Sequence, residues 1–505
     1  MMARAYLGID VGTFETKGVL VGNDGQVLAQ ASRRHGISTP ADKQVEQDAD
    51  AVWWADVSAV ARDIMATPYA HGVEIQAMAV SAIGPCVLPL DESLRPLRPG
   101  ILYGIDARAE EEIALLRERL GDDEIARRTG NTLTSQSAGT KIMWVTRNEP
   151  EVASKARWYV TSQSYLVARL TGEVTIDHGT AGYFHPFYDL GSQRWDLTGV
   201  EDIVRVEQLP KILWATDVAG YVTAEASAET GIPVGVPVLV GTTDSPAEAV
   251  GAGVVNPGDV MLQYGSAGYM INVLDAPHTH PDLWAAPFVF PGSFVAAAGT
   301  ATAGTVTRWI ANLLRLDASQ GDQAMFAELI ALAEKAPVGS RGVLMLPHLS
   351  GERTPLQDAD ARGVFHGLSL ADGPAEFARA ALEGVAHSLA HAFLTFEEAG
   401  LHTGTIRAIG GGTKNPILLQ SVSALTGKTQ ITCDSVGAAY GDAILSAYAT
   451  GRFGSRGEIL EWVRERDRVE PDPDMAAILR ADHSDYRSLY HSTKALSHSR
   501  VEKFR

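Results

Sequence analysis

Three features are scarce in this chain, and each scarcity excludes a class of protein. The 505 residues include only two cysteines, Cys86 and Cys433, which lie far apart in sequence. A disulfide framework is therefore excluded, and a reducing compartment is expected. No run of roughly 18 apolar residues occurs without polar interruption, so no membrane-spanning helix is predicted. The N-terminus enters a strand pattern with no signal-peptide hydrophobic region, and we expect a cytoplasmic protein with no membrane partner.

Positive charge is also scarce, and several sequence fingerprints are missing. Lys and Arg total 42 against 61 Asp and Glu, which gives a formal net charge of −19 and argues against a nucleic-acid partner. There is no G-x-S-x-G segment, so no nucleophile elbow of a serine hydrolase is present. The sequence Gly427-Lys428-Thr429 lacks the earlier glycine of a P-loop, where Val422 stands instead. Gly251-Ala252-Gly253 lacks the third glycine of a dinucleotide fingerprint, which argues against a dehydrogenase.

The length and two similar units indicate two large domains. At about 150 residues per domain, a chain of 505 residues could form three domains, and two large ones are the safer prediction. A strand, a glycine turn and a second strand are predicted at 6–21 and again at 260–273, which suggests a duplicated domain. A turn cluster at 256–259 marks the boundary. We therefore predict domains over 1–255 and 256–470, followed by a polar, partly helical tail over 471–505.

Between these units, strands and helices follow the pattern of an α/β protein. Strands are predicted over 75–82, 99–106, 237–240 and 406–409, and helices over 48–65, 110–120, 382–396, 416–425 and 437–448. Another helix follows the strand at 237–240. Ser245 and Glu248 have the spacing of a capping box, and Pro246 takes the first helical position. This pattern makes Ser245 the helix cap and leaves Asp244 just outside the helix.

The turn of the first unit combines a carboxylate, glycine, a hydroxyl and a cation. Asp10 ends a strand, and Gly12, Thr13 and Lys17 follow. Backbone N–H groups in such a turn can hold phosphate oxygens. A nearby carboxylate can hold Mg²⁺ through water, since Mg²⁺ keeps most of its hydration. Gly265 and Ser266 occupy the equivalent turn of the second unit. Taken singly, each turn is more typical of an ordinary hairpin than of a phosphate site.

Asp244 is the candidate general base. A hydroxyl that attacks phosphorus loses its proton, and a carboxylate within hydrogen-bond reach can accept it. An Asp at a strand end that does not cap the following helix suits this role. The plainer interpretation is a turn or capping residue, which is the commoner fate of Asp before a helix.

Gly410-Gly411-Gly412 separates a predicted strand from a helix. Three glycines allow a flat ring to approach the backbone closely. Asn415, at the start of the helix, could then bond to a nucleotide. The alternative is a simple helix-entry turn.

Several segments in a fixed order carry a likeness to a known family. In chain order they are Gly8-Ile9-Asp10-Val11-Gly12-Thr13 with Lys17, Val45-Glu46-Gln47-Asp48, Thr129-Gly130-Asn131, Lys141-Ile142-Met143-Trp144, Leu170-Thr171-Gly172-Glu173, Pro347-His348-Leu349-Ser350-Gly351-Glu352-Arg353-Thr354-Pro355, Ala361-Arg362-Gly363 and Ile409-Gly410-Gly411-Gly412. Together they resemble the FGGY family of carbohydrate kinases, in particular its xylulokinase-like branch, over most of the chain.

The resemblance implies two ribonuclease-H-like domains of the actin and hexokinase type around a central cleft. It implies transfer of the γ-phosphoryl group of ATP, with Mg²⁺, to a hydroxyl of a small sugar or polyol, most closely a pentulose. A homodimer is also consistent with it, since dimers are common among such relatives.

The resemblance also assigns roles to single residues. Asp10 matches the metal-associated aspartate, and Asp244 matches the catalytic base. The matching phosphate and nucleotide positions are Gly12, Thr13, Lys17, Gly265, Ser266, Gly304, Gly411 and Asn415. The sugar is expected between the turn that holds Gly84 and Pro85, the pair Asp106 and Arg108, and Asp244.

One segment departs from the family pattern. Xylulokinases usually carry Gln-Met-His after the third strand, and this chain has Ala82-Ile83-Gly84-Pro85-Cys86 there. A site without that hydrogen-bonding group is expected to lose preference for the hydroxyl it served.

The sequence is also compatible with two other functions. An ATPase of the same fold that acts on no sugar would release ADP without stimulation by polyols. A sugar- or nucleotide-binding regulator that has lost catalysis would bind nucleotide and form no product.

Overall fold

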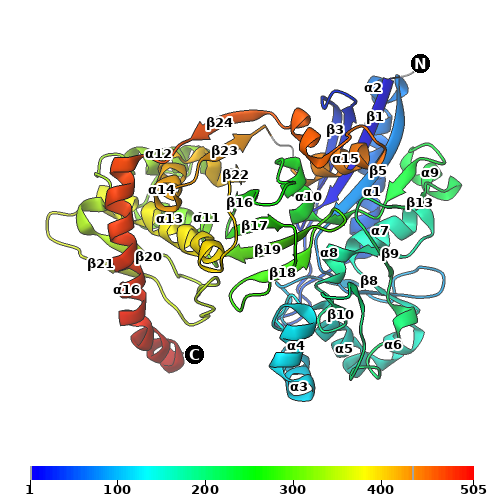
Figure 1. Ribbon diagram of the computed structural model, residues 1–505, viewed down its shortest axis with the longest axis horizontal. Helices are drawn as coiled ribbons and strands as arrows, with labels where there is room; N and C mark the ends of the chain where they lie inside the picture. The colour runs from blue at the N-terminus through cyan, green and yellow to red at the C-terminus, as the bar shows by residue number, and fades with distance from the viewer. Residues whose placement is uncertain (1–2, 435–436, 505) are drawn as a thin grey trace.

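Two mixed sheets of seven strands each, one in each half of the chain, organise the protein (Figure 1). The computed structural model describes residues 3–434 and 437–504. The first sheet is built from strands between residues 3 and 243, and the second from strands between 260 and 469. The predicted boundary at 256–259 falls in the turn that leads into the second sheet.

The first sheet is centred on β1, the strand that carries Asp10 near its end. Its strands, in spatial order, are β13 (Val218–Tyr221), β14 (Pro237–Leu239), β5 (Val73–Ala82), β1 (Ala3–Val11), β2 (Glu15–Gly22) and β3 (Val27–Arg34), and the short β15 (Thr242–Thr243) pairs with β5. β1 is antiparallel to β2 and parallel to β5. The β2–β3 hairpin turns at Gly25, whose φ of 82° is readily adopted by glycine.

The second sheet repeats this arrangement. Its strands, in spatial order, are β18 (Trp284–Pro287), β19 (Phe294–Gly299), β17 (Gly268–Leu274), β16 (Val260–Tyr264), β22 (Ile406–Ile409), β23 (Gln430–Cys433) and β24 (Glu465–Val469). β16 is antiparallel to β17 and parallel to β22, as β1 is to β2 and β5. The central strands of the two halves thus have matching partners, as the paired strand–turn–strand units predict.

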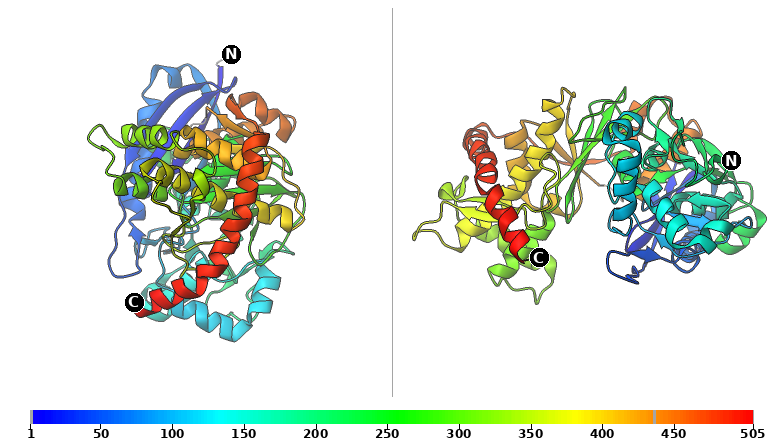
Figure 2. Two further views of the ribbon diagram at one scale, coloured as in Figure 1. Left: turned by 90° about the vertical axis from the view of Figure 1, so that its left-hand side faces the viewer. Right: turned by 90° about the horizontal axis from the view of Figure 1, so that it is seen from below.

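Helices cover both sheets, and two lobes are visible when the molecule is viewed from below (Figure 2). The main helices of the first half are α1 (Ala55–Met65), α3 (Glu110–Leu120), α4 (Asp122–Thr129), α5 (Ala138–Asn148), α7 (Ser162–Thr171) and α10 (Asp244–Gly251). Those of the second half are α11 (Gly304–Leu313), α12 (Asp322–Ala333), α13 (Pro374–Glu398), α14 (Pro416–Thr426), α15 (Ala438–Ala449) and α16 (Pro473–Phe504).

Helix α15 joins the two halves, because it comes from the second half and packs on the first sheet (Figure 1). The contact is backbone to backbone. A Cβ added at Gly8 of β1 would lie 1.9 Å from the carbonyl oxygen of Ala439, and one at Gly441 would lie 1.8 Å from that of Ala247 in α10. Glycine therefore lets α15 approach both β1 and α10 more closely than any other residue would allow.

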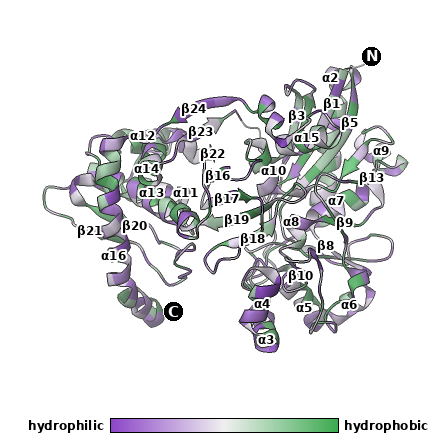
Figure 3. Ribbon diagram, viewed as in Figure 1, coloured by the Kyte–Doolittle hydropathy of each residue, from purple (hydrophilic) through white to green (hydrophobic). Residues whose placement is uncertain are grey.

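Hydropathy separates the sheet interiors from their exposed edge (Figure 3). Buried strands such as β5 are largely apolar, whereas β24, at the edge of the second sheet, has the sequence Glu-Arg-Asp-Arg-Val and is mostly exposed. Charges on an edge strand hinder pairing with another chain. Within the part of the chain that is described, no helix is both long enough and apolar enough to span a bilayer.

The structure corrects three local predictions. Only Gly100–Ile101 (β7) are strand within 99–106, because Asp106 accepts a hydrogen bond from the backbone of Val45 and anchors the remainder as a loop. α10 begins at Asp244 with Thr243 as its cap residue, so Ser245 is not the cap and Asp244 lies inside the helix. Residues 473–504 form one long helix, α16, whose buried face packs against α14.

Candidate active site

A cavity of about 590 Å³ lies between the two halves and includes Asp244 in its wall. Pairing of β15 with β5 brings the chain to this wall, and α10 then starts at Asp244. The backbone N–H of Ser245 donates to Asp244 Oδ1 at 2.8 Å and fixes the carboxylate. Burial raises the pKa of Asp244 to about 6.

Both halves contribute to this cavity. The first half supplies Gly84, Tyr103, Gly104, Thr134, Ser135, Gln136, Tyr183, Thr243, Asp244, Ser245, Pro246 and Glu248. The second half supplies Gln263, Gly265, Ser266, Ala267, Gly268, Tyr269, Trp284, Ala298, Gly299, Arg353, Thr354 and Gln357. The predicted Gly265–Ser266 turn therefore lies in the same cavity as Asp244, although the two are contributed by different halves.

A second cavity, of about 690 Å³, adjoins the first. Lys17 of β2 and Gly411 both line it, as does Lys414, and Glu248 lines both cavities. Glu248 lies one helical turn after Asp244, so the two carboxylates share a face of α10. Burial raises the pKa of Glu248 to about 7, and the charge of Asp244 adds to the rise while Lys17 opposes it.

Asp10 is partly exposed near the end of β1, and the buried Asp442 lies close to it. Ser81 Oγ is 3.0 Å from Asp10 Oδ1 and 2.7 Å from Oδ2 of Asp442 on α15. Burial, and then the neighbouring charge of Asp244, raise the pKa of Asp10 well above its usual range. A bound cation would favour the ionised form of this carboxyl.

Hydrogen bonds hold the β1–β2 turn, which is the predicted phosphate turn. Gly12 N donates to Glu15 O at 3.0 Å and closes the β1–β2 turn. Thr13 Oγ1 lies 3.0 Å from the hydroxyl of Tyr103, a residue of the first cavity. The turn thus contacts a residue that lines the first cavity.

Glycine allows close approach at the turns of the second half. Gly304 N donates to Gly265 O at 2.9 Å, and a Cβ at Gly304 would lie 2.7 Å from that oxygen. Gly410 has a φ of 90° and packs on the backbone of Tyr264. A Cβ at Gly411, in contrast, would meet nothing within 4 Å, so its surface faces open space. Gly304 and Gly410 are explained by packing, and Gly411 is free to meet a ligand.

Four predicted site residues are placed differently from the expectation. Asn415 is the N-cap of α14, where its Oδ1 accepts a hydrogen bond from Leu418 N, and it does not line either cavity. The side chains of Asp106 and Arg108 are buried and bind each other through three hydrogen bonds of 2.7–3.0 Å. This placement corrects the predicted sugar contact. The polar groups of Asp106 and Arg108 are used inside the fold, and neither residue lines the cavity. Pro85 is also buried, and only Gly84 of that turn reaches the cavity.

Asp106 and Arg108 instead support the loop that carries Tyr103. Arg108 also pairs with Glu46 at 2.8 Å and lies over the ring of Trp144. The buried Lys141 amine donates to the carbonyl oxygens of Leu102 and Tyr103, each at 2.6 Å. These contacts hold in place the loop whose Tyr103 lines the cavity.

Several cavity residues were not expected from the sequence. Tyr103, Gln136, Tyr183, Trp284 and Arg353 all line the cavity. Arg353 lies within a segment that carries the family likeness, and Glu248 could have been found from its spacing to Asp244. The others lie on loops or at an edge strand, where no periodic pattern marks them.

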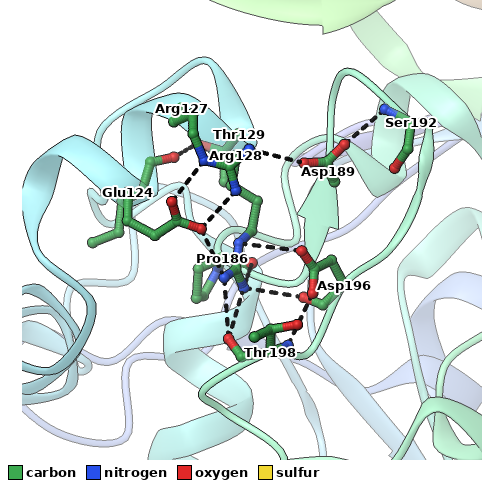
Figure 4. Close-up of polar contacts among 10 residues, drawn as sticks. Glu124, Arg127, Arg128, Thr129, Pro186, Asp189, Ser192, Asp196 and Thr198 are labelled. Carbon is green, nitrogen blue, oxygen red and sulfur yellow. Dashed lines mark hydrogen bonds and ion pairs between the residues drawn. The ribbon is translucent and has the colours of Figure 1, made fainter.

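An arginine network within the first half ties the end of α4 to the loop around Asp196 and Thr198 (Figure 4). Arg128, at the end of α4, is 2% exposed, and its guanidinium donates to the carbonyl oxygens of Asp196 and Thr198 and to Glu124. The chain then turns at Gly130 and presents Asn131 to the second sheet.

Asn131 pairs with the edge strand β18 as another strand would. Its Nδ2 donates to Ala285 O at 2.8 Å, and its Oδ1 accepts from Ala285 N at 2.9 Å. Ala285 follows Trp284 directly, so this pair fixes the strand that carries Trp284 into the cavity.

Comparisons with known proteins cover nearly the whole chain. Residues 5–251 match the N-terminal domain of the FGGY family of carbohydrate kinases, and residues 263–450 match its C-terminal domain. A xylulose kinase of Escherichia coli (strain K12) is 30% identical over 492 residues, which are 96% of this chain and 98% of that protein. A gluconokinase of Bacillus subtilis (strain 168) is 28% identical over 489 residues, which are 94% of this chain and 93% of that protein.

Solved structures agree with this assignment. The crystal structure of a xylulose kinase from Rhodospirillum rubrum superposes with a TM-score of 0.91 at 30% identity, and covers 98% of this chain and 100% of that one. The predicted fold class is confirmed. Because the relatives divide between xylulose kinases and gluconokinases, the sugar stays open. The chain belongs to the FGGY family of carbohydrate kinases and is an ATP-dependent carbohydrate kinase.

Proposed function

We propose that the protein transfers the γ-phosphoryl group of ATP to a hydroxyl of a small ketose or polyol, with a pentulose as the preferred acceptor. One observation carries the proposal. Asp244, from the first half, and the Gly265–Ser266 turn, from the second, line the same cavity. A base and a glycine turn with backbone amides in one cavity suit in-line transfer between two bound substrates.

Asp244 is the proposed general base. An acceptor hydroxyl within hydrogen-bond reach of its carboxylate gives up its proton as the oxygen attacks phosphorus. The Ser245 N–H bond to Oδ1 keeps the carboxylate in one orientation for this step. No covalent enzyme intermediate is needed.

The phosphate groups are proposed to lie between the two glycine turns. Backbone amides around Gly12 and Thr13, and around Gly265 and Ser266, would stabilise charge on the transferring group. Lys17 and Gly411 line the second cavity, which we assign to the nucleotide. Gly304 supports the second turn by packing against Gly265.

Asp10 is the proposed Mg²⁺-associated carboxylate, through water. Mg²⁺ in proteins is commonly bound by one or two carboxylates, substrate phosphates and several waters. Asp10 fits this donor set because it is a partly exposed carboxylate whose pKa is raised by burial and by Asp244, so a cation would relieve its unfavourable charge. When bound, Mg²⁺ would offset charge on the phosphate oxygens.

The cavity lining limits the acceptor. Tyr103, Gln136 and Thr134 offer hydrogen-bond partners suited to hydroxyls, and Trp284 offers an apolar face. Arg353 is the one basic residue among those that line this cavity in the described structure, and it favours an aldonate such as gluconate as a second candidate.

Substrate choice is tested by ADP release in a coupled assay. The panel is D-xylulose, D- and L-ribulose, hexuloses, polyols of three to six carbons, and D-gluconate. A pentulose is expected to give the highest kcat/KM. A clear preference for gluconate would replace the pentulose proposal, and ADP release without any stimulation would contradict the whole assignment of the cavity.

The activity is expected to fall at acidic pH. Burial raises the pKa of Asp244 to about 6, and only the ionised carboxylate can accept a proton. The value of kcat/KM for the acceptor, which reports the free enzyme, should therefore decrease as pH falls below about 6. A profile that stays level from pH 7 to pH 5, measured where the protein remains folded, would contradict this role.

A further inference from the structure

We propose that Asp442, on α15 of the second half, is a positioning residue for Asp10 on the first half: Asp442 holds Ser81, and Ser81 holds Asp10. This inference rests on the proposed role of Asp10 beside the transferring phosphate. It adds a residue from the second half of the chain to the arrangement that orients this carboxylate.

Two hydrogen-bond contacts in series form the link. The backbone N–H of Ser81 donates to Asp442 Oδ2 at 3.0 Å, and the Ser81 hydroxyl lies 2.7 Å from the same oxygen. The same hydroxyl is 3.0 Å from Asp10 Oδ1. Ser81 and Asp10 are neighbours in the parallel register of β5 and β1, so the hydroxyl reaches Asp10 directly.

The burial of Asp442 argues for a positioning role. Ser81 and Asp442 are both 0% exposed, and Asp442 Oδ1 has no hydrogen-bond partner within the described ranges 3–434 and 437–504. Burial raises the pKa of Asp442 well above its usual range, with no basic residue among the causes. A buried carboxyl with one unused oxygen is unfavourable for folding. We therefore explain the presence of this buried carboxyl by its hydrogen bonds to Ser81.

The position of Asp442 is fixed from both sides. Its neighbour Gly441 packs against the backbone of Ala247 in α10, and Ala439 packs against Gly8 in β1. α10 carries Asp244, and β1 carries Asp10. A displacement of α15 would thus move Ser81 and alter the orientation of the Asp10 carboxylate.

The test compares Ser81→Ala, Asp442→Ala and the isosteric Asp442→Asn with the parent protein. Ser446→Ala is the matched control, since Ser446 is fully buried one turn further along α15 and its hydroxyl donates to Asp442 O of the same helix. Four quantities are measured for each: kcat, the KM for sugar, the Mg²⁺ concentration at half-maximal activity, and the melting temperature.

Ser81→Ala is expected to lower kcat or raise the Mg²⁺ requirement by about 10-fold or more, the usual effect of losing a partner behind a metal-associated ligand. The KM for sugar should stay unchanged. Asp442→Ala should give a similar loss, Asp442→Asn a smaller one, and Ser446→Ala none. Because Ser81 and Asp442 act in one chain of contacts, the double variant should be no worse than the poorer single variant.

Some outcomes would overturn the inference. Normal kcat and Mg²⁺ requirement in Ser81→Ala would do so, and this variant decides the matter if Asp442→Ala does not fold. Additive losses that affect sugar KM and melting temperature equally would indicate a purely structural role. Asp10→Asn is the further arm. If it retains full activity, the proposed role of Asp10 fails; if it is inactive while Ser81→Ala is normal, only the present inference fails.

Discussion

Replacing Asp244 with asparagine is expected to lower turnover by about 100-fold or more while ATP binding persists, the scale of general-base loss. Asparagine keeps the shape of the side chain and can still accept the hydrogen bond from Ser245 N through its amide oxygen. It cannot take a proton at neutral pH. The change therefore removes the chemical step and leaves the cavity intact. Steady-state turnover and calorimetric titration with ATP check the two halves of the expectation.

A matched control separates proton acceptance from the loss of a buried carboxyl. Burial also raises the pKa of Asp177 to about 6, but this residue caps a short helix and does not line the cavity. Asp177→Asn should keep turnover close to that of the parent protein. Near-normal turnover in Asp244→Asn, or an equal loss in both variants, would remove Asp244 from the role of base.

Much of the fold follows from local sequence patterns. The β1–β2 and β16–β17 units were predictable because alternating apolar residues end at glycine turns, and hairpins are local structures. α10 was misplaced at its start for a reason that local patterns do not contain. β15 pairs with the distant β5 up to Thr243, so the helix begins at once with Asp244.

Some residues of the candidate site could be predicted from local sequence, and others could not. Asp10 and Asp244 each follow a predicted strand closely, and the carboxyl ends of parallel strands meet at one edge of a sheet. The sequence could therefore identify both as site candidates. Asp106 and Arg108 are equally polar, yet they bind each other inside the fold, and Arg108 also pairs with Glu46. Tyr103 and Gln136, which do reach the cavity, lie on irregular loops fixed by contacts such as Gly104 N to Gln136 Oε1 at 3.1 Å. Such pairings between distant segments leave no periodic trace in the sequence.

Replacing Gly441 with alanine is expected to destabilise the protein by about 3 kcal/mol, at the upper end of typical overpacking losses. Two effects oppose each other. Alanine favours the helical state over glycine by about 1 kcal/mol, which would stabilise α15. The added Cβ, however, would lie 1.8 Å from Ala247 O and 2.6 Å from its carbonyl carbon, and both are backbone atoms. A backbone cannot rotate away as a side chain can, so α10 and α15 must separate.

The helix separation decides the outcome, because it also disturbs the buried residues packed around the junction, including Ala249, Ala443 and Ile444. Thermal and urea unfolding should show a clear decrease in stability for Gly441→Ala. Gly36→Ala is the control, since a Cβ there would meet nothing within 4 Å and its effect should stay within about 0.5 kcal/mol. Turnover of the folded fraction should fall as well, because α10 carries Asp244 and α15 carries Asp442. An unchanged melting temperature for Gly441→Ala would show that α10 and α15 can move apart without loss of stability. That result would contradict the view that their close contact joins the two halves rigidly.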